Sequence, residues 1–340
     1  MTHSAAPAPA PAAAPVTTGA AGTTGAAGTT GTAGTSPAAG LGRLAGRLRG
    51  RGPGRLGPVA LVISAGVSVQ FGAALAVTLM PRAGAAGVVS LRLVAAAVVL
   101  LLICRPRIRG YSRADWTTVL AFGVAMAGMN GLFYQAVERI PLGPAVTLEV
   151  LGPLVLSVFA SRRLSSLLWA GLALCGVALL GGAGGSGMGS LDPLGAAFAL
   201  GAGAMWAAYI VFSARTGRRF PQADGLALAM AFAAVISLPL GIAEAGDRLV
   251  VPGTLALGLG VALLSSVLPY TLELLALRRL PAPTFAVLMS LEPAIAATAG
   301  FLVLGQGLSL TDALAIALVI AASMGAVRSQ AKRMPPTAEA

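Results

Sequence analysis

From residue 58 onward the chain is a succession of apolar runs, each about as long as a helix that crosses a membrane. Ten runs can be read, at roughly 58–80, 86–104, 116–137, 142–160, 165–182, 192–213, 225–244, 254–277, 282–304 and 311–327. A spanning helix needs about 20 apolar residues, whereas the strands of a membrane barrel would alternate polar and apolar residues. The runs therefore predict an all-α integral membrane protein with ten transmembrane helices.

The composition excludes several classes of protein. Charged residues make up only 10% of the 340 residues, against about 25% in soluble domains, so a soluble enzyme is excluded. One histidine, His3, and two cysteines, Cys104 and Cys175, cannot form a His-based catalytic triad, a zinc site or a disulfide framework. The sequence also lacks the GxxxxGK[ST] loop that binds ATP. We expect no enzymatic activity, no metal and no cofactor.

The positive charges alternate between the loops. If the N-terminus is inside, the inside loops and tails hold 19 of the 23 Lys and Arg, and only Arg82, Arg139 and Arg248 lie outside. Cytoplasmic loops of membrane proteins carry this excess. We therefore expect a multi-pass plasma (inner) membrane protein with both termini in the cytoplasm. The net charge of +12 is spread over alternate loops and not gathered in a groove, so nucleic acid is not an expected partner.

The tails are expected to lie outside the membrane. Residues 1–57 begin with a low-complexity stretch in which the hexamer Thr-Thr-Gly-Ala-Ala-Gly repeats from Thr17, a composition typical of disordered segments. Five arginines between Arg43 and Arg55 then form a basic juxtamembrane segment. It sets the orientation of the first helix or, alternatively, contacts anionic membrane lipids. Residues 328–340 are the expected C-terminal cytoplasmic tail.

An internal repeat appears when the chain is shifted by 140 residues. Seven residues of the segment 132–153 then coincide with the segment 272–293: the pairs Leu132/Leu272, Ala136/Ala276, Arg139/Arg279, Pro141/Pro281, Leu148/Leu288, Leu151/Leu291 and Pro153/Pro293. We interpret residues 58–182 and 192–327 as two repeats of five spans, joined by the Gly-rich linker 183–191. Because five is odd, the second repeat enters the membrane in the opposite sense, as in the inverted repeats of secondary transporters.

Four charged residues lie deep inside the runs, where charge is expensive and usually functional. They are Arg92, Glu149, Glu273 and Glu292. Glu292 lies ten residues into its run, about 15 Å deep, and under the shift it faces Glu149 across the symmetry axis. Pro153 and Pro293 follow the two glutamates and free backbone carbonyls, which at membrane depth line cavities. The alternative is a purely structural pair, with Arg92 neutralising Glu149.

The residues that resemble a known family lie in both halves. They include Met129–Tyr134, Ile140–Gly143, Leu148-Glu149, Gly152-Pro153 and Ser161–Arg163, then Leu200–Ile210, Leu268–Glu273, Arg279–Pro281 and Glu292–Ala294. In this pattern the chain resembles the drug/metabolite transporter superfamily, EamA type, over roughly residues 58–327. Two departures are Gln306, where a glutamate is usual, and Val77, where the exporter with the most similar pattern carries a lysine. The resemblance implies two inverted five-helix EamA repeats and export of small amino acids such as threonine and homoserine.

The same residues define a candidate substrate site. Besides the four charged residues, it includes side chains with polar tips within the runs: Asn130, Tyr134, Trp206, Tyr209 and Tyr270. A zwitterionic amino acid needs a carboxylate for its ammonium group, donors for its own carboxylate and an apolar wall, and this set supplies all three. The expected function is secondary export of small amino acids, with proton antiport left open. The alternative is export of another small metabolite or a cationic drug. A homodimer is compatible with the sequence but has no support in it.

Overall fold

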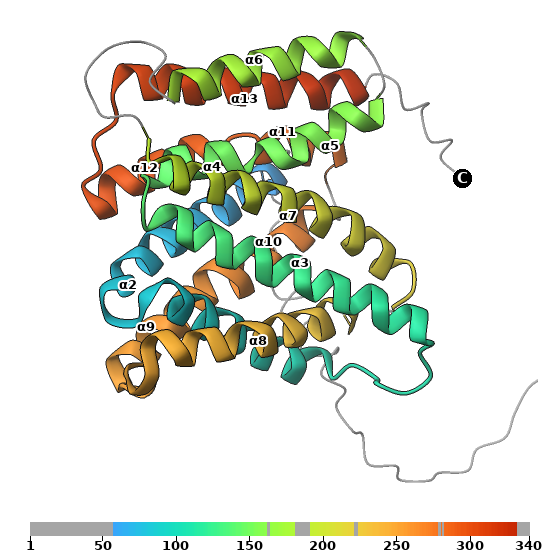
Figure 1. Ribbon diagram of the computed structural model, residues 1–340. Coiled ribbons are helices and arrows are strands. Elements are labelled where there is room, and N and C mark those ends of the chain that lie inside the picture. Colours follow the sequence, from blue (N-terminus) through green and yellow to red (C-terminus); the bar gives the residue numbers. More distant parts are fainter. Residues whose placement is uncertain are drawn as a thin grey trace, which may run out of the picture. The chain divides into compact units, whose positions relative to one another are not determined.

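The computed structural model describes residues 57–161, 164–180, 191–220, 224–277, 280 and 282–331. All of them belong to one compact unit, Pro37–Ala340, and the described part of the chain consists of helices and their connections, without strands (Figure 1). The N-terminal tail up to residue 56, residues 183–190 of the expected linker, Arg162, Arg163, Arg278, Arg279 and most of the C-terminal tail lie outside the described residues. Their predicted roles stay predictions.

The first helix of the described residues, α2, covers Gly57–Cys104 and is broken in the middle. Gly84 has φ 67° and ψ 172°, so the helix consists of two arms that meet at this residue. The positive φ suits glycine. Just after the break, the backbone N–H groups of Ala86 and Gly87 donate to Glu244 Oε2 at 2.6 and 3.3 Å. The break falls between the first two apolar runs. The helix arm that follows it is capped by Glu244, a residue of α8 far along the chain.

The next long helices begin with side-chain caps. α3 (Arg113–Val137) starts with a capping box in which Ser112 and Asp115 each accept from the other's backbone N–H. Asp115 also forms an ion pair with Arg219 at 2.6 Å. α7 (Pro193–Gly217) begins at Asp192, whose carboxylate accepts from the N–H groups of Leu194 and Gly195. α3 packs along α7 (Figure 1).

Three apolar segments are interrupted partway along. The first consists of α4 (Leu142–Glu149) and α5 (Leu151–Ser161), and the second of α11 (Ala282–Met289) and α12 (Glu292–Leu304). In the third, α9 (Pro252–Ala262) passes through a π-helical turn, η3 (Leu263–Val267), into α10 (Leu268–Leu277). The regular helical backbone of these three segments is thus interrupted in the interior of the bundle.

The remaining elements complete the bundle. α6 (Leu164–Leu180) lies along α13 (Leu310–Ala331), and α8 (Asp224–Ala245), followed by the 3₁₀ turn η2 (Gly246–Val250), lies along α2. α2 also packs against α9, α10 and α12, so it lies at the centre of the helix contacts. Small residues allow some of these contacts. Gly195, Ala199 and Gly203 of α7 are all buried, and a Cβ on Gly203 would lie 2.5 Å from the Glu149 carbonyl oxygen.

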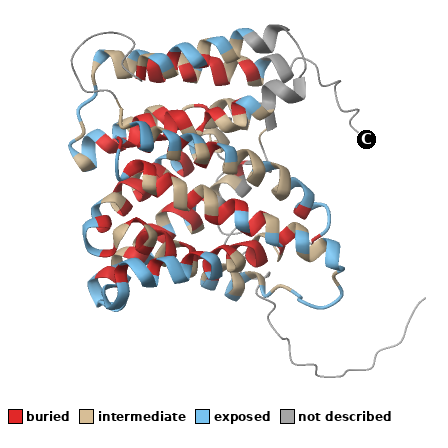
Figure 2. Cartoon of the chain, in the orientation of Figure 1, coloured by how far each residue is buried: buried red, intermediate tan, exposed pale blue. Residues whose placement is uncertain are grey.

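The outer surface of the described bundle is apolar. Figure 2 shows exposed residues along the outer helix faces and buried residues between the helices. The exposed side chains include Leu168, Val235 and Leu310, which are 74%, 67% and 77% exposed. Scattered apolar exposure is common, but large aliphatic side chains exposed along whole helices suit contact with lipid.

Six helical stretches in the described residues are long and apolar enough to cross a membrane: Gly57–Cys104, Arg113–Val137, Pro193–Gly217, Asp224–Val250, Val287–Leu304 and Leu310–Arg328. Three apolar helical stretches are shorter: Leu142–Leu156, Leu168–Leu180 and Pro252–Val267. The predicted all-helical membrane fold is thus confirmed. The count of ten spans stays a prediction.

Candidate functional site

A cavity of about 450 Å³ lies between the central helices. Its size falls within the range of small-molecule sites, which are mostly apolar with a few polar groups. The lining residues come from α2, α3, α4, α5, α7, η3, α10, α11, α12 and α13. Most helices of the described bundle therefore contribute to one site, and α6, α8 and α9 do not.

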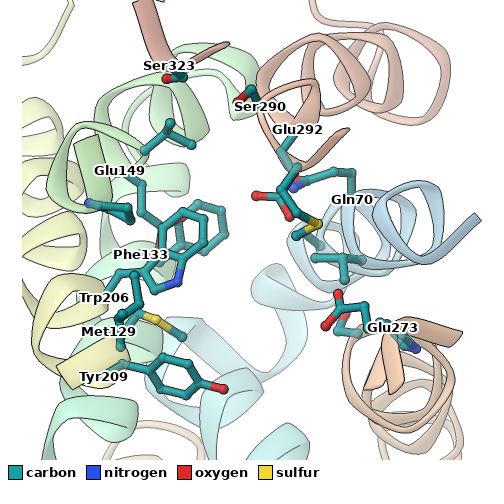
Figure 3. A pocket seen from close by; sticks show the side chains of 18 of the residues that line it. Gln70, Met129, Phe133, Glu149, Trp206, Tyr209, Glu273, Ser290, Glu292 and Ser323 are labelled. Atoms are coloured by element: carbon teal, nitrogen blue, oxygen red, sulfur yellow. The ribbon is translucent and has the colours of Figure 1, made fainter. Parts of the chain in front are cut away.

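The cavity has two walls of different chemistry. Figure 3 shows Met129, Phe133, Glu149, Trp206 and Tyr209 along one wall, from α3, α4 and α7. Gln70, Glu273 and Glu292 line the wall opposite, from α2, α10 and α12. One wall is thus mainly aromatic with a single carboxylate, and the other carries two carboxylates and an amide.

The interrupted helices position two of the carboxylates. α4 ends at Glu149, and Pro153 follows in the first turn of α5. Glu292 is the first residue of α12 and precedes Pro293. A helix N-terminus favours a negative charge, which supports a carboxylate at Glu292. Its side chain is only 7% exposed. Both glutamates therefore lie where a helix breaks, next to the cavity.

Arg92 is the cationic residue of the cavity lining. Its NH1 donates to the Tyr134 hydroxyl at 3.3 Å, and its NH2 donates to the Ser265 carbonyl at 3.1 Å. The guanidinium carbon lies 5.8 Å from the centroid of the Tyr134 ring, within cation–π range. Among the described residues the one ion pair is Arg219–Asp115. The expected neutralisation of Glu149 by Arg92 is therefore not a direct ion pair.

The cavity brings together most of the predicted site residues. Its lining includes Arg92, Asn130, Glu149, Trp206, Tyr209, Glu273 and Glu292, together with Pro153. Tyr134 is fully buried beside Arg92, and Pro293 is buried next to Glu292. The side chain of Tyr270 lies outside the described residues. Asn130 donates its amide to the Met126 carbonyl of its own helix at 2.9 Å. The roles of these residues stay predictions.

Sequence reasoning missed several polar residues of the lining. They are Gln70, Ser265, Ser290 and Ser323. Gln70 could have been found, because an amide inside an apolar run is costly without a function or a partner. The serines carry no such signal, since serine is common in transmembrane helices. Among the described residues, five buried side-chain polar atoms have no hydrogen-bond partner, and four of them belong to cavity-lining residues: Gln70, Arg92, Ser265 and Ser323.

The donor set suits an organic zwitterion better than a metal. No group of three His, Cys, Asp or Glu side chains within the described ranges could hold a metal ion. The three glutamates are distributed over two opposite walls, while a guanidinium, an amide and hydroxyls supply the remaining polar contacts. Such an arrangement can bind a small molecule that carries charges of both signs.

A polar cavity at the breaks of membrane helices is the arrangement of substrate sites in secondary transporters. Residues 193–328 match the EamA-like transporter family. The chain is 43% identical over 268 residues to the threonine/homoserine exporter RhtA of Salmonella typhimurium strain LT2, an alignment that covers 79% of this chain and 90% of that exporter. It is 41% identical over 278 residues to the RhtA exporter of Escherichia coli strain K12, an alignment that covers 81% of this chain and 94% of that exporter. The chain therefore belongs to the EamA-like transporter family.

A solved structure extends the comparison to the fold. Described only as "Crystal structure of protein", it superposes with a TM-score of 0.57 at 17% sequence identity and covers 82% of this chain and 99% of its own. At this identity the likeness concerns the fold alone. The curated relatives are exporters, so the activity of this family lies in transport and not in enzymatic catalysis.

Proposed function

We propose that the chain is a secondary exporter of small amino acids, with threonine and homoserine as its substrates. The observation that carries this proposal is the cavity, which is lined by two glutamates at helix breaks, a third glutamate and an arginine, in a chain 41% identical over 278 residues to a threonine/homoserine exporter. The ammonium group of an amino acid would pair with a glutamate. The aromatic wall formed by Phe133, Trp206 and Tyr209 would cover the short side chain.

The proposal includes ten spans arranged as two inverted repeats. α2 has 48 residues, which at 1.5 Å per residue would extend about 72 Å, more than twice the thickness of a bilayer core. Two spans that turn at Gly84 resolve this excess. α4–α5, α9–α10 and α11–α12 would each cross once as a broken helix. With α3, α6, α7, α8 and α13, the count is ten.

The bounds of the helices support the repeat. Shifted by 140 residues, α4 (Leu142–Glu149) coincides with α11 (Ala282–Met289). The same shift places α3 (Arg113–Val137) on the stretch from the start of α9 to the end of α10 (Pro252–Leu277), with the same last residue and a start that differs by one residue. The same shift relates pairs of cavity-lining residues: Met129 and Pro269, Phe133 and Glu273, Glu149 and Met289, Val150 and Ser290. The two halves would therefore contribute equivalent positions with different chemistry.

Proton antiport is the proposed source of energy. Glu292 is buried and borders the cavity, so one carboxylate could bind either a proton or the ammonium group of the substrate, but not both. Competition between the two is the minimum requirement for antiport. The two termini would lie in the cytoplasm, and the transport would run outward across the inner membrane.

A second candidate function is export of a cationic drug or another small amine. The observation in its favour is the excess of three glutamates over one arginine in the cavity lining. A single positive charge would then be bound between the carboxylates of the two walls, without any need for a donor to a substrate carboxylate.

Export from loaded cells distinguishes the two functions. Cells that lack their own amino-acid exporters would be loaded with a threonine- or homoserine-containing dipeptide, and efflux of the free amino acid would be compared with and without the full chain. A cationic dye would be loaded in parallel. Faster loss of threonine and homoserine, without faster loss of dye, is expected. Faster loss of the dye alone would replace the proposed function by the second.

A further inference from the structure

Arg92 forms no direct ion pair within the described residues, and the charge of Glu149 acts on it only at longer range. Within the described residues, both of its hydrogen bonds go to neutral oxygens, the Tyr134 hydroxyl and the Ser265 carbonyl, and its buried Nε has no partner. In the part of the chain that the structure describes, no carboxylate pairs with it. An unpaired charge at membrane depth is costly and is kept where it has a function. The guanidinium therefore has donors available for an anion.

Ser265 adds a second group at the same place. The residue whose carbonyl accepts from Arg92 NH2 also presents a buried hydroxyl without a hydrogen-bond partner. Ser265 lies in the π-helical turn η3 (Leu263–Val267), and π-helical turns within α-helices are frequent at functional sites. The turn is held against α2 by a hydrogen bond from Ser68 Oγ to the Leu264 carbonyl at 2.6 Å. A guanidinium and a hydroxyl thus share one fixed position on the cavity lining.

The chemistry of this position matches a carboxylate. A guanidinium offers a planar fork of N–H groups that fits the two oxygens of a carboxylate, and a serine hydroxyl can donate one further hydrogen bond. The acidic groups Glu273 and Glu292, with the unpartnered Oε1 of Gln70, line one wall of the cavity and suit an ammonium group (Figure 3). An amino acid carries both charged groups on its α-carbon and could satisfy both the guanidinium and the glutamates.

We propose that Arg92 and Ser265 form the subsite for the α-carboxylate of the substrate, so that the transporter selects amino acids with a free carboxylate. This inference rests on the proposed function and narrows its substrate class to compounds with a free carboxylate. A bare amine would leave Arg92 unpaired and would be repelled by it. Rejection through an unpaired buried charge is a common device for specificity. Arg92 would thus exclude the cationic compounds that the three glutamates alone would attract.

Binding to the purified full chain tests the subsite without relying on transport. Trp206, one of three tryptophans in the chain, lines the cavity, so its fluorescence reports occupancy. Threonine and threonine amide would be titrated separately. The amide has the same ammonium group and side chain but no carboxylate charge. The wild-type chain is expected to bind threonine about a hundredfold more tightly than the amide, since a site built for a polar group strongly rejects an analogue that lacks it.

Variants assign the preference to Arg92. Arg92→Gln is expected to lower the affinity for threonine about a hundredfold and to leave the affinity for the amide unchanged or improved. Arg92→Lys, which keeps the charge but loses the planar fork, should fall between. Arg82→Gln is the matched control, because Arg82 is exposed and outside the cavity lining, and it should bind both ligands as the wild type does.

Several outcomes would overturn the subsite. Equal affinity of the wild type for threonine and its amide would reject it while leaving amino-acid export intact. An equal loss of affinity for both ligands in Arg92→Gln would indicate a structural role of Arg92. If Arg92 variants do not reach the membrane, Ser265→Ala decides. It should lower the affinity for threonine several-fold and leave the affinity for the amide unchanged. If the affinity for threonine is not selectively lowered, the subsite is rejected. A wild type that binds and exports no amino acid would instead refute the proposed function, and the subsite with it.

Discussion

Gly152 of α5 and Gly203 of α7 touch backbone to backbone, because a Cβ on Gly152 would collide with the Gly203 carbonyl. A Cβ on Gly203 would in turn lie 2.5 Å from the carbonyl oxygen of Glu149. The contact therefore fixes the end of α4, and with it a carboxylate of the cavity, against a neighbouring helix. Close approach of this kind is a common use of small residues in membrane helices.

Gly203→Ala should displace the end of α4 and destabilise the protein. Overpacking of a tight contact costs about 1–3 kcal/mol, so we expect a lower melting temperature of the detergent-purified chain and weaker threonine export. Gly171→Ala is the control, since a Cβ there meets nothing within 4 Å. Unchanged stability and export in Gly203→Ala would show that the helices can separate at no cost.

Glu292→Gln should uncouple export from the pH gradient. The amide keeps the shape and hydrogen bonding of the carboxylate but cannot exchange a proton. We expect proteoliposomes with this variant to lose pH-driven export, while exchange of labelled for unlabelled threonine without a gradient partly survives. Asp247→Asn, which changes an exposed acid outside the cavity lining, should behave as the wild type. Normal pH-driven export by Glu292→Gln would shift the coupling role to Glu149 or Glu273, and loss of folded protein would indicate a structural role.

Gln306 should tolerate replacement by glutamate but not by leucine. Its Oε1 accepts the backbone N–H of Leu142 at 3.0 Å, at the start of α4. A carboxylate would accept the same hydrogen bond and is favoured at a helix N-terminus, so the glutamate that the family resemblance leads us to expect here would serve the same contact. Gln306→Leu should cost about 1–2 kcal/mol, measurable as a lower melting temperature. Equal stability of the leucine variant would contradict this role.

The proposed orientation is tested by a fusion after Val327. A reporter enzyme that is active only outside the inner membrane should be silent there, because the positive charges of the loops assign the C-terminus to the cytoplasm. A reporter active only in the cytoplasm, fused at the same residue, should be active and serves as the control. Activity of the first and silence of the second would refute the ten-span arrangement.

The fold could be predicted from the sequence to the extent that hydropathy controls it. The apolar runs predicted an all-helical membrane protein, and the spacing of four between the small residues Gly195, Ala199 and Gly203 is typical of a close helix contact. The π-helical turn at Leu263–Val267 could not be predicted, because the residues LLSSV have no signal that separates a π-turn from an α-turn. The cap of Gly84 by Glu244 depends on tertiary contact between distant segments, which periodicity does not contain.

The charged part of the site was more predictable than its neutral part. Charge at membrane depth is so costly that Arg92, Glu149, Glu273 and Glu292 could be selected from single positions, and all four line the cavity. The hydrogen-bond partners of Arg92 could not be predicted: position along a helix gives no rotation about the helix axis, and Arg92 donates to Tyr134 and Ser265. Ser290 and Ser323 became visible only through the packing.

The helix contacts of the described bundle also constrain how the protein can be made. α2, the first described helix, packs mainly on α8, α9, α10 and α12, and α6 lies along α13, the last described helix. Helices that leave the ribosome early must therefore wait in the lipid for partners that are synthesised much later. Closing such distant contacts is slow. While the second half of the chain is still being synthesised, the early helices would lack their partners and would be exposed to quality-control proteases.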